Sequence, residues 1–268
     1  MSAELNDVSP GVVRVSWSTD LQEQGLRTSA DTVRGLVESA FKGGSTRVEA
    51  HVDPGDQTAQ RVATFAGLMR EGVARGVADE SDRIVYARLV NDTPLEEPQG
   101  FRSLLNSFLP RKRAISQMLI RSTDGRVLLC QLTYKRDLDL PGGVVEVGES
   151  PQLAVSREVE EELGLTLEAG RLVLTDWLPP WGGWDDAVCL VFDGGVHDPS
   201  MLEGIVRQER EIRAVSFATM AEVQEQCADF TTRRIQAALR NLSDQPGPAY
   251  TERGRSLPDQ APGTPQSS

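Results

Sequence analysis

The sequence predicts an α/β protein of two domains. The chain has 268 residues, which is long for one ordinary domain. Short apolar runs alternate with helical patterns over residues 1–92 and again over residues 113–242. A stretch rich in Pro, Glu and Arg, residues 93–112, separates these regions, and we expect it to be a linker.

The first region contains three strand-like runs with helical patterns between them. The expected strands are Val12 to Trp17, Arg47 to Val52 and Ile84 to Leu89, and the expected helices are Ala30 to Phe41 and Thr58 to Leu68. We assign no element before Val12. This region is therefore predicted to be a small α/β unit.

The second region begins with two strand-like runs, residues 114–122 and 126–133, around the turn signal Asp124-Gly125. Three further strands and one closing helix are expected at Leu172 to Trp177, Ala187 to Phe192, Ile212 to Phe217 and Met220 to Leu242. Residues 243–268 are rich in proline and poor in large apolar side chains, so we predict a disordered tail.

Charge and composition exclude several classes of function. The formal charge of −12 repels polyanions and argues against nucleic-acid binding. No stretch is apolar enough to span a bilayer, and Met1 to Gly11 lacks the features of a signal peptide, so we expect a cytoplasmic protein without membrane contact. The 3 cysteines are far apart and predict free thiols instead of a disulfide frame or a zinc site.

The stretch "REVEEELG", residues 157–164, holds a dense run of glutamates. A capping serine and a proline, Ser150-Pro151, mark a helix start before it, and Gly164 marks its end. On this helix Glu158, Glu161 and Glu162 fall on one arc, while Glu160 points elsewhere. Like charges so close destabilise a helix unless a cation neutralises them, and Mg²⁺ or Mn²⁺ suits oxygen ligands best. A solvated acidic face is the alternative.

The residues around this run resemble the signature of the Nudix hydrolase family. The stretch "LPGGVVEVGESPQLAVSREVEEELGL" has Gly143, Glu149, Arg157-Glu158, Glu161-Glu162 and Gly164 at the spacing of that signature. The resemblance implies that residues 113–242 form an α/β/α sandwich with a mixed sheet between helices.

The same resemblance implies a reaction, the hydrolysis of the pyrophosphate linkage in a nucleoside diphosphate joined to another group. Glu158, Glu161 and Glu162, with the Gly143 carbonyl, would bind Mg²⁺ or Mn²⁺. Arg157 would orient a carboxylate, and Glu149 would pair with Arg157. The catalytic residues would thus be Glu161, Arg157 and Glu149.

Three assignments around this site stay open. The general base is Glu161 within the signature, or Glu209 or Glu211 in a later loop. Lys135 and Arg136 are candidate phosphate contacts, or else an exposed basic pair. The tryptophans of "DWLPPWGGWDD" stack on a base or close on their own domain.

Residues 10–92 resemble the C-terminal half of the GNAT superfamily of N-acetyltransferases, through "TDLQEQGLRTSADTVRGLVESAF" and the segment that follows it. In that family a glycine-rich turn holds the pyrophosphate of the acyl-CoA cofactor. Here Gly25 is kept, but Glu23 and Arg27 stand where small residues are expected. We therefore expect a degenerate, non-catalytic GNAT-like half-domain that serves docking, homodimer formation or ligand sensing.

Two other functions remain as alternatives. The first is a regulator that senses a nucleotide through the Nudix fold, which the full set of carboxylates disfavours. The second is acyl-CoA binding or acetyltransferase activity in the N-terminal region, which Glu23 and the missing half of the domain disfavour.

Overall fold

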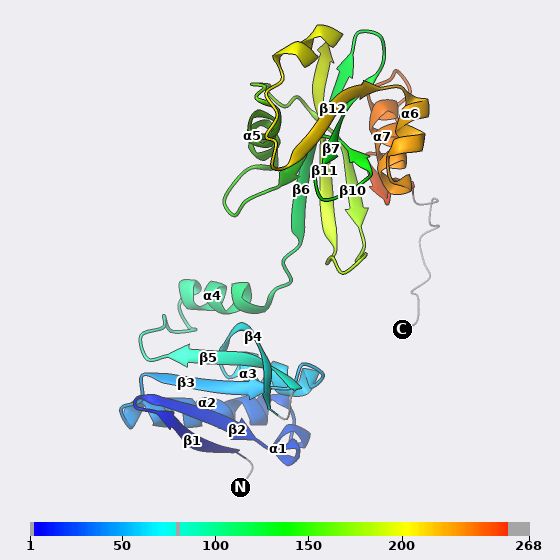
Figure 1. Cartoon of the computed structure of the whole chain (residues 1–268). Helices are drawn as coiled ribbons and strands as arrows, with labels where there is room; N and C mark the ends of the chain where they lie inside the picture. Colours follow the sequence, from blue (N-terminus) through cyan, green and yellow to red (C-terminus); the bar gives the residue numbers. More distant parts are fainter. Residues whose placement is uncertain (1–2, 79–80, 257–268) are drawn as a thin grey trace. The chain divides into compact units, whose positions relative to one another are not determined.

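The computed structural model describes residues 3–78 and 81–256, and the chain divides into two compact units, residues 1–110 and residues 111–268 (Figure 1). Each unit is built on its own sheet. Among the described residues, none of the helices is both long and apolar enough to cross a membrane.

The first unit has a five-stranded sheet of order β1-β2-β3-β5-β4, with β2 and β3 parallel and the other pairs antiparallel. The strands are β1 Ala3–Ser9, β2 Val12–Trp17, β3 Arg47–Val52, β4 Met69–Ala78 and β5 Ser81–Leu89. The helices are α1 Thr19–Glu23, α2 Leu26–Lys42, α3 Gln57–Phe65 and α4 Pro98–Phe108. Alternate residues of β3, Val48 and Ala50, pack with Val33 and Val37 of α2 in one core.

Four elements of this unit were not predicted, namely β1, β4, α1 and α4. The edge strands β1 and β4 contain charged residues and glycines in place of a clear apolar alternation, and their backbones pair with β2 and β5. Helix α4 corrects the prediction that residues 93–112 are a linker. It starts at Pro98, buries Leu104, and Ser107 Oγ accepts a 3.1 Å hydrogen bond from the Arg70 N–H of β4.

The second unit has a mixed sheet of order β12-β7-β6-β11-β10-β13, with β8 paired to β7 and β9 to β6. β6 pairs with β11 in parallel, as β10 does with β13, and the other pairs are antiparallel. The strands are β6 Arg113–Ser122, β7 Val127–Leu132, β8 Leu138–Asp139, β9 Gly142–Val144, β10 Leu172–Leu178, β11 Ala187–His197, β12 Ile212–Ala218 and β13 Tyr250–Glu252. The helices are α5 Pro151–Leu163, η1 Pro199–Gly204, α6 Met220–Gln226 and α7 Asp229–Asn241.

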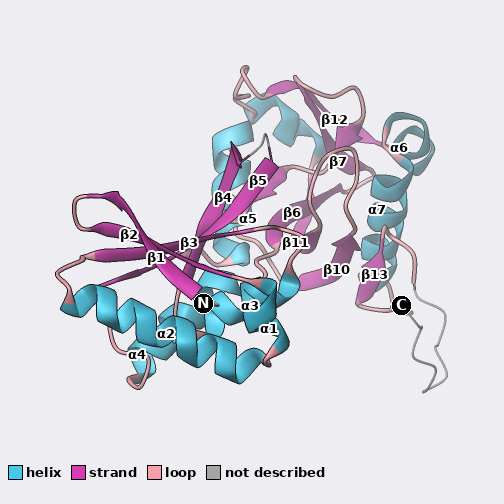
Figure 2. Ribbon diagram, turned by 90° about the horizontal axis from the view of Figure 1, so that it is seen from below, coloured by secondary structure: helices cyan, strands magenta, loops and turns pink. Residues whose placement is uncertain are grey.

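Helices cover both faces of this sheet, with α5 on one side and α6 and α7 on the other (Figures 1 and 2). Strand β6 shows why: Met118 and Ile120 share a core with Val159 of α5, whereas Leu119 between them shares a core with Ile235 of α7. All five side chains are fully buried. The predicted sandwich with a mixed sheet is therefore confirmed.

The C-terminal part corrects two further predictions. The expected helix from Met220 to Leu242 is interrupted at Cys227, whose φ of −99° and ψ of 153° are extended and which forms a bridge with Leu138. The predicted disordered tail, residues 243–268, contains strand β13, where the Thr251 side chain is fully buried. Residues 257–268 of that prediction lie outside the described residues.

Candidate functional site

Helix α5 carries the glutamate run, and its two ends agree with the sequence signals. Ser150 is the extended N-cap residue, and Pro151 occupies the first turn. Gly164 ends the helix in the left-handed conformation, with φ 66°. Because Val155, Val159 and their neighbours are buried against the sheet, the orientation of the glutamates around the helix axis is fixed.

Strand β9 begins with Gly142 and Gly143, which are called the glycine turn below, and they lie against two carboxylates of this helix. The backbone N–H of Gly142 donates a 3.0 Å hydrogen bond to Glu162 Oε2. A Cβ atom at Gly143 would lie 2.6 Å from Cδ of Glu158, and one at Gly142 would lie 2.2 Å from the Ser116 carbonyl oxygen. Glycine at position 143 therefore allows the close approach of strand β9 to Glu158, and glycine at position 142 allows its close approach to strand β6.

Arg157 contacts three carboxylates, those of Glu149, Glu158 and Glu161. Its Nε donates to Glu149 Oε1 at 2.9 Å and its Nη2 to Glu149 Oε2 at 3.0 Å, a two-pronged pair. Nη1 donates to Glu161 Oε2 at 2.9 Å, and Nη2 lies 3.1 Å from Glu158 Oε1. The hydrogen bonds from Arg157 lower the pKa of Glu149. The expected Arg157–Glu149 and Arg157–Glu161 contacts are present, whereas their catalytic roles stay predictions.

Glu162 is the most buried carboxylate of the run, with 5% of its surface exposed. Burial raises its pKa to about 7, and the charges of Glu158 and Glu211 add to this, against the Gly142 N–H, which lowers it. Burial also raises the pKa of Glu158, partly offset by Arg157. The protein itself therefore places too little positive charge near Glu158 and Glu162 to neutralise both carboxylates.

These residues fit a divalent cation of the oxygen-binding kind. Glu158 and Glu162 converge on a glycine turn that would be filled by a single Cβ, and both carboxyl groups hold raised pKa values. In residues 3–78 and 81–256, no three His, Cys, Asp or Glu side chains already meet as a metal-binding group. Glu161, half exposed, is turned to Arg157.

The structure distinguishes the two loop candidates for the general base, Glu209 and Glu211. The chain after η1 lies along the end of α5, where Val206 N–H donates to the Leu163 carbonyl and Gln208 N–H donates to the Glu162 carbonyl, both at 2.9 Å. Glu211 is near enough for its charge to raise the pKa of Glu158 and Glu162. Glu209 is exposed in the same turn.

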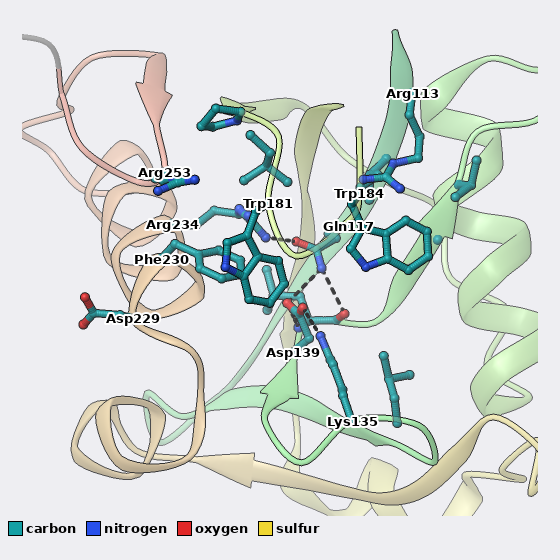
Figure 3. A pocket seen from close by; sticks show the side chains of 18 of the residues that line it. Arg113, Gln117, Lys135, Asp139, Trp181, Trp184, Asp229, Phe230, Arg234 and Arg253 are labelled. Carbon is teal, nitrogen blue, oxygen red and sulfur yellow. Dashed lines mark hydrogen bonds and ion pairs between the residues drawn. The ribbon is translucent and has the colours of Figure 1, made fainter. Parts of the chain in front are cut away.

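A cavity of about 490 Å³ opens beside the glycine turn, and both Gly142 and Gly143 line it (Figure 3). Lys135 also lines it, although its Nζ is paired with Asp139 Oδ2 at 2.6 Å. Arg136 is exposed and is not one of the described residues that form the cavity wall. The structure thus brings Lys135 to the site and leaves Arg136 outside it.

Two of the three tryptophans considered for base stacking, Trp181 and Trp184, line this cavity. Trp177 instead lies under the Lys112 ammonium group, 5.3 Å from the ring centroid. Only Trp181 and Trp184 are therefore placed to stack on a base, and for these two residues both roles, stacking on a base and closing on their own domain, remain open.

The buried polar network behind the cavity was not predicted. Arg234, 2% exposed, donates from Nε to Asp176 Oδ2 at 2.9 Å and from Nη1 to Gln117 Oε1 at 3.0 Å. The other oxygen of Asp176 accepts 2.7 Å bonds from the Thr251 hydroxyl and the Gly254 N–H. One available signal was the charge of Asp176 at an inward position of β10, in register with the buried Leu174.

Several known proteins are similar to this chain, and one family profile includes the residues of the site. A family profile described as "NUDIX domain" matches residues 110–239. A MutT-like protein of Streptomyces ambofaciens is 34% identical over 126 residues, which are 47% of this chain and 75% of that protein. An 8-oxo-dGTP diphosphatase of Haemophilus influenzae is 41% identical over 51 residues, which are 18% of this chain and 38% of that protein. The crystal structure of a MutT protein from Methanosarcina mazei has a TM-score of 0.44 at 23% identity, and the match covers 52% of this chain and 100% of that one.

Proposed function

This chain belongs to the Nudix family and is a Nudix pyrophosphohydrolase, and from this premise we propose that it cleaves the pyrophosphate linkage of a nucleoside diphosphate joined to another group, with Mg²⁺ or Mn²⁺. One observation supports this most directly. The glycine turn that contacts Glu158 and Glu162 also lines the cavity, so carboxylates and a space for substrate share one backbone segment.

In this proposal Glu158, Glu161 and Glu162, with the Gly143 carbonyl, hold the cation. When bound, the cation neutralises phosphate oxygens and lowers the pKa of the attacking water. Arg157 fixes the directions of Glu158 and Glu161, and Glu149 fixes Arg157 in turn. Lys135 borders the space where the phosphates would lie, while Arg136 serves as an outer contact at most.

The attacking water loses a proton, and Glu161 and Glu211 are the proposed acceptors. Glu161 is exposed enough to exchange its Arg157 contact for water. Glu211 lies in the loop before β12, and its charge raises the pKa of Glu162. Substitution of each by glutamine, with Glu209→Gln as the matched control in the same turn, separates the two by their pH–rate profiles.

We further propose that the first unit is a GNAT-like half-domain without acetyltransferase activity. Gly25, with φ 97°, caps helix α2, so the turn has the backbone freedom of a cofactor loop. Glu23 at the end of α1 gives it the wrong charge for a pyrophosphate. Homodimer formation is one role that such a unit could serve.

The test is a screen of diphosphate compounds with Mg²⁺ or Mn²⁺, scored by the release of mononucleotide and phosphate. It includes ADP-ribose, nucleotide sugars, dinucleoside polyphosphates, coenzyme A derivatives and nucleoside triphosphates, with 8-oxo-dGTP among them. At least one class should be cleaved, and Glu161→Gln and Glu162→Gln should each lower turnover by about two orders of magnitude or more while keeping the circular dichroism spectrum. A wild-type protein that cleaves nothing, or two variants within a few-fold of wild type, would contradict the proposal.

A further inference from the structure

The cavity beside the glycine turn has an aromatic wall built on one tight hairpin. Trp181 and Trp184 exchange both backbone hydrogen bonds, at 3.1 and 2.9 Å, around Gly182 and Gly183, which have φ values of 57° and 85°. Residues directly opposite in such a pair project to the same face. Both indoles therefore belong to the cavity wall, as Figure 3 shows.

Each indole has a partner on another element of the same unit. The Trp181 ring meets the Phe230 ring of α7 edge to face, with 5.7 Å between centroids. The Arg113 guanidinium lies over the Trp184 ring at 4.7 Å. A flat, aromatic ligand suits a wall of this kind, because ring faces stack on one another.

Arg234 lies on the same side of the cavity as Phe230, and one of its hydrogen-bond donors is unsatisfied. Its Nε and Nη1 are satisfied by Asp176 and Gln117, but Nη2 is buried without a partner. Buried N–H groups of charged side chains almost always have an acceptor, so this atom requires an explanation. Of the described residues that line the cavity, the other with such an atom is Arg113, through Nε, which is also a donor.

The missing acceptor is better explained by a neutral oxygen than by a phosphate. The positive charge of Arg234 is already balanced by Asp176, its buried partner at 2.9 Å. Phe230 lies 5.6 Å from the guanidinium, so the surroundings are aromatic.

We propose that this cavity selects a nucleobase with a keto oxygen over its amino counterpart, and that Nη2 of Arg234 donates to that oxygen. An amino group in the same place is a hydrogen-bond donor, so it could not accept from Nη2 of Arg234. The inference rests on the proposed function, since a nucleotide substrate is what would bring a base to the cavity.

The donor is held in place before any ligand arrives. Asp176 is fixed by Thr251 and Gly254, and the Gln117 amide is fixed through its Nε2, which donates to Asp139 Oδ1 at 2.9 Å. A donor that cannot turn away penalises a ligand without an acceptor, and this is how polar sites reach high selectivity.

The test measures binding of nucleoside monophosphates to the full chain with Mg²⁺, by quenching of tryptophan fluorescence. These probes contain no pyrophosphate linkage, so the result is independent of turnover. IMP has a keto group where AMP has an amino group, together with a proton on the adjacent ring nitrogen, and UMP differs from CMP in the same way. We expect IMP and UMP to bind at least about tenfold more tightly than AMP and CMP.

Arg234→Lys keeps a positive charge beside Asp176 and removes Nη2, so both ratios should fall to within about threefold of unity. Arg233→Lys is the matched control, because Arg233 also lines the cavity but its Nε donates to the Arg253 carbonyl and its Nη1 to Asp229. This control should keep the wild-type ratios.

Equal affinities within each pair for the wild-type protein would overturn the inference, and this outcome needs no variant to fold. Unchanged ratios in a folded Arg234→Lys protein would overturn it too. Equal weakening of all four nucleotides and of inorganic pyrophosphate would assign Arg234 to a phosphate instead. Keto selectivity in a protein that hydrolyses no diphosphate would sink the proposed function and leave this inference standing.

Discussion

The backbone N–H of Gly142 donates to the Glu162 carboxylate over 3.0 Å, although the two residues are 20 positions apart. This bond joins strand β9 to helix α5 at the point where Gly143 also touches Glu158. A main-chain donor is fixed by the sheet, so it holds a buried carboxylate more rigidly than a long side chain could. Three predictions concern this junction.

Gly143→Ala should weaken binding of Mg²⁺ by about tenfold or more and lower turnover accordingly. The new Cβ would lie 2.6 Å from Glu158 Cδ, so the carboxylate must move. Isothermal titration with Mg²⁺ measures the affinity. Gly204→Ala, where nothing lies within 4 Å of the added Cβ, is the control and should bind Mg²⁺ normally. Normal affinity in both variants would show that the closeness of Gly143 and Glu158 is unimportant for metal.

Arg157→Lys should lower kcat/KM by about 10- to 100-fold although it keeps the charge. An ammonium group cannot bond Glu149 through two prongs and also reach Glu161, as the guanidinium does here. Steady-state kinetics at several Mg²⁺ concentrations provide the measurement. Arg126→Lys, at a surface pair with Asp124, should have no effect. If Arg157→Lys were fully active, charge alone would be sufficient at this position.

The metal-free protein should lose stability between pH 4.5 and pH 7 through Glu162. Its pKa of about 7 in the folded state lies above the ordinary value of 4.5, so the folded state binds more protons in this interval. The contribution is fully present below the lower value and disappears as pH rises to the upper one. It amounts to about 3 kcal/mol at most.

Glu162→Gln keeps the shape of the side chain and removes the titration. Urea unfolding in EDTA at pH 4.5, 6 and 7.5 should therefore show the wild type losing stability relative to this variant as pH rises. Parallel curves for the two proteins would mean that Glu162 titrates near its ordinary value.

Removal of residues 243–268 should lower the melting temperature by several degrees and weaken nucleotide binding. Without Thr251 and Gly254, one oxygen of the buried Asp176 loses both of its donors. Removal of residues 257–268 keeps these contacts and is the control. Equal melting temperatures for the two shortened proteins would argue against a structural role for β13.

The fragment of residues 111–268 should fold and hydrolyse the substrates of the whole chain, and residues 1–110 should not bind acetyl-CoA. The carboxylates, the glycine turn and the cavity all lie within the second unit. Calorimetry with acetyl-CoA and a hydrolysis assay of the fragment test the two halves of this prediction. A folded but inactive fragment would place part of the active assembly in the first unit.

Much of the second unit could be predicted because its elements have clear local signals. Helix α5 starts at Ser150-Pro151 and ends at Gly164. Proline and glycine restrict or free the backbone only locally, so their effect can be predicted from a few neighbouring residues. The Asp124-Gly125 turn, with Gly125 at φ 85°, joins β6 to β7 as expected. Local conformational preference is sufficient in such places.

The missed elements depend on partners distant in the chain. Strand β13 is three residues long and follows a proline-rich stretch, so its own sequence favours no strand, and only pairing with β10 makes it one. The break at Cys227 likewise follows from its bridge to Leu138. The polar network behind the cavity joins Gln117, Asp176 and Arg234 from three elements, which no spacing rule connects.

The late position of β13 has a consequence for the order of events during synthesis. Asp176 can bond Thr251 and Gly254 only after those residues have left the ribosome, and Arg234 itself precedes them by little. Helix α5 ends at Leu163, and the core in which it packs needs residues up to Phe217, all of which precede Thr251 in the chain. A nascent chain halted after β12 would thus already carry its glutamate run and this core, whereas the polar network behind its cavity would still await α7 and β13.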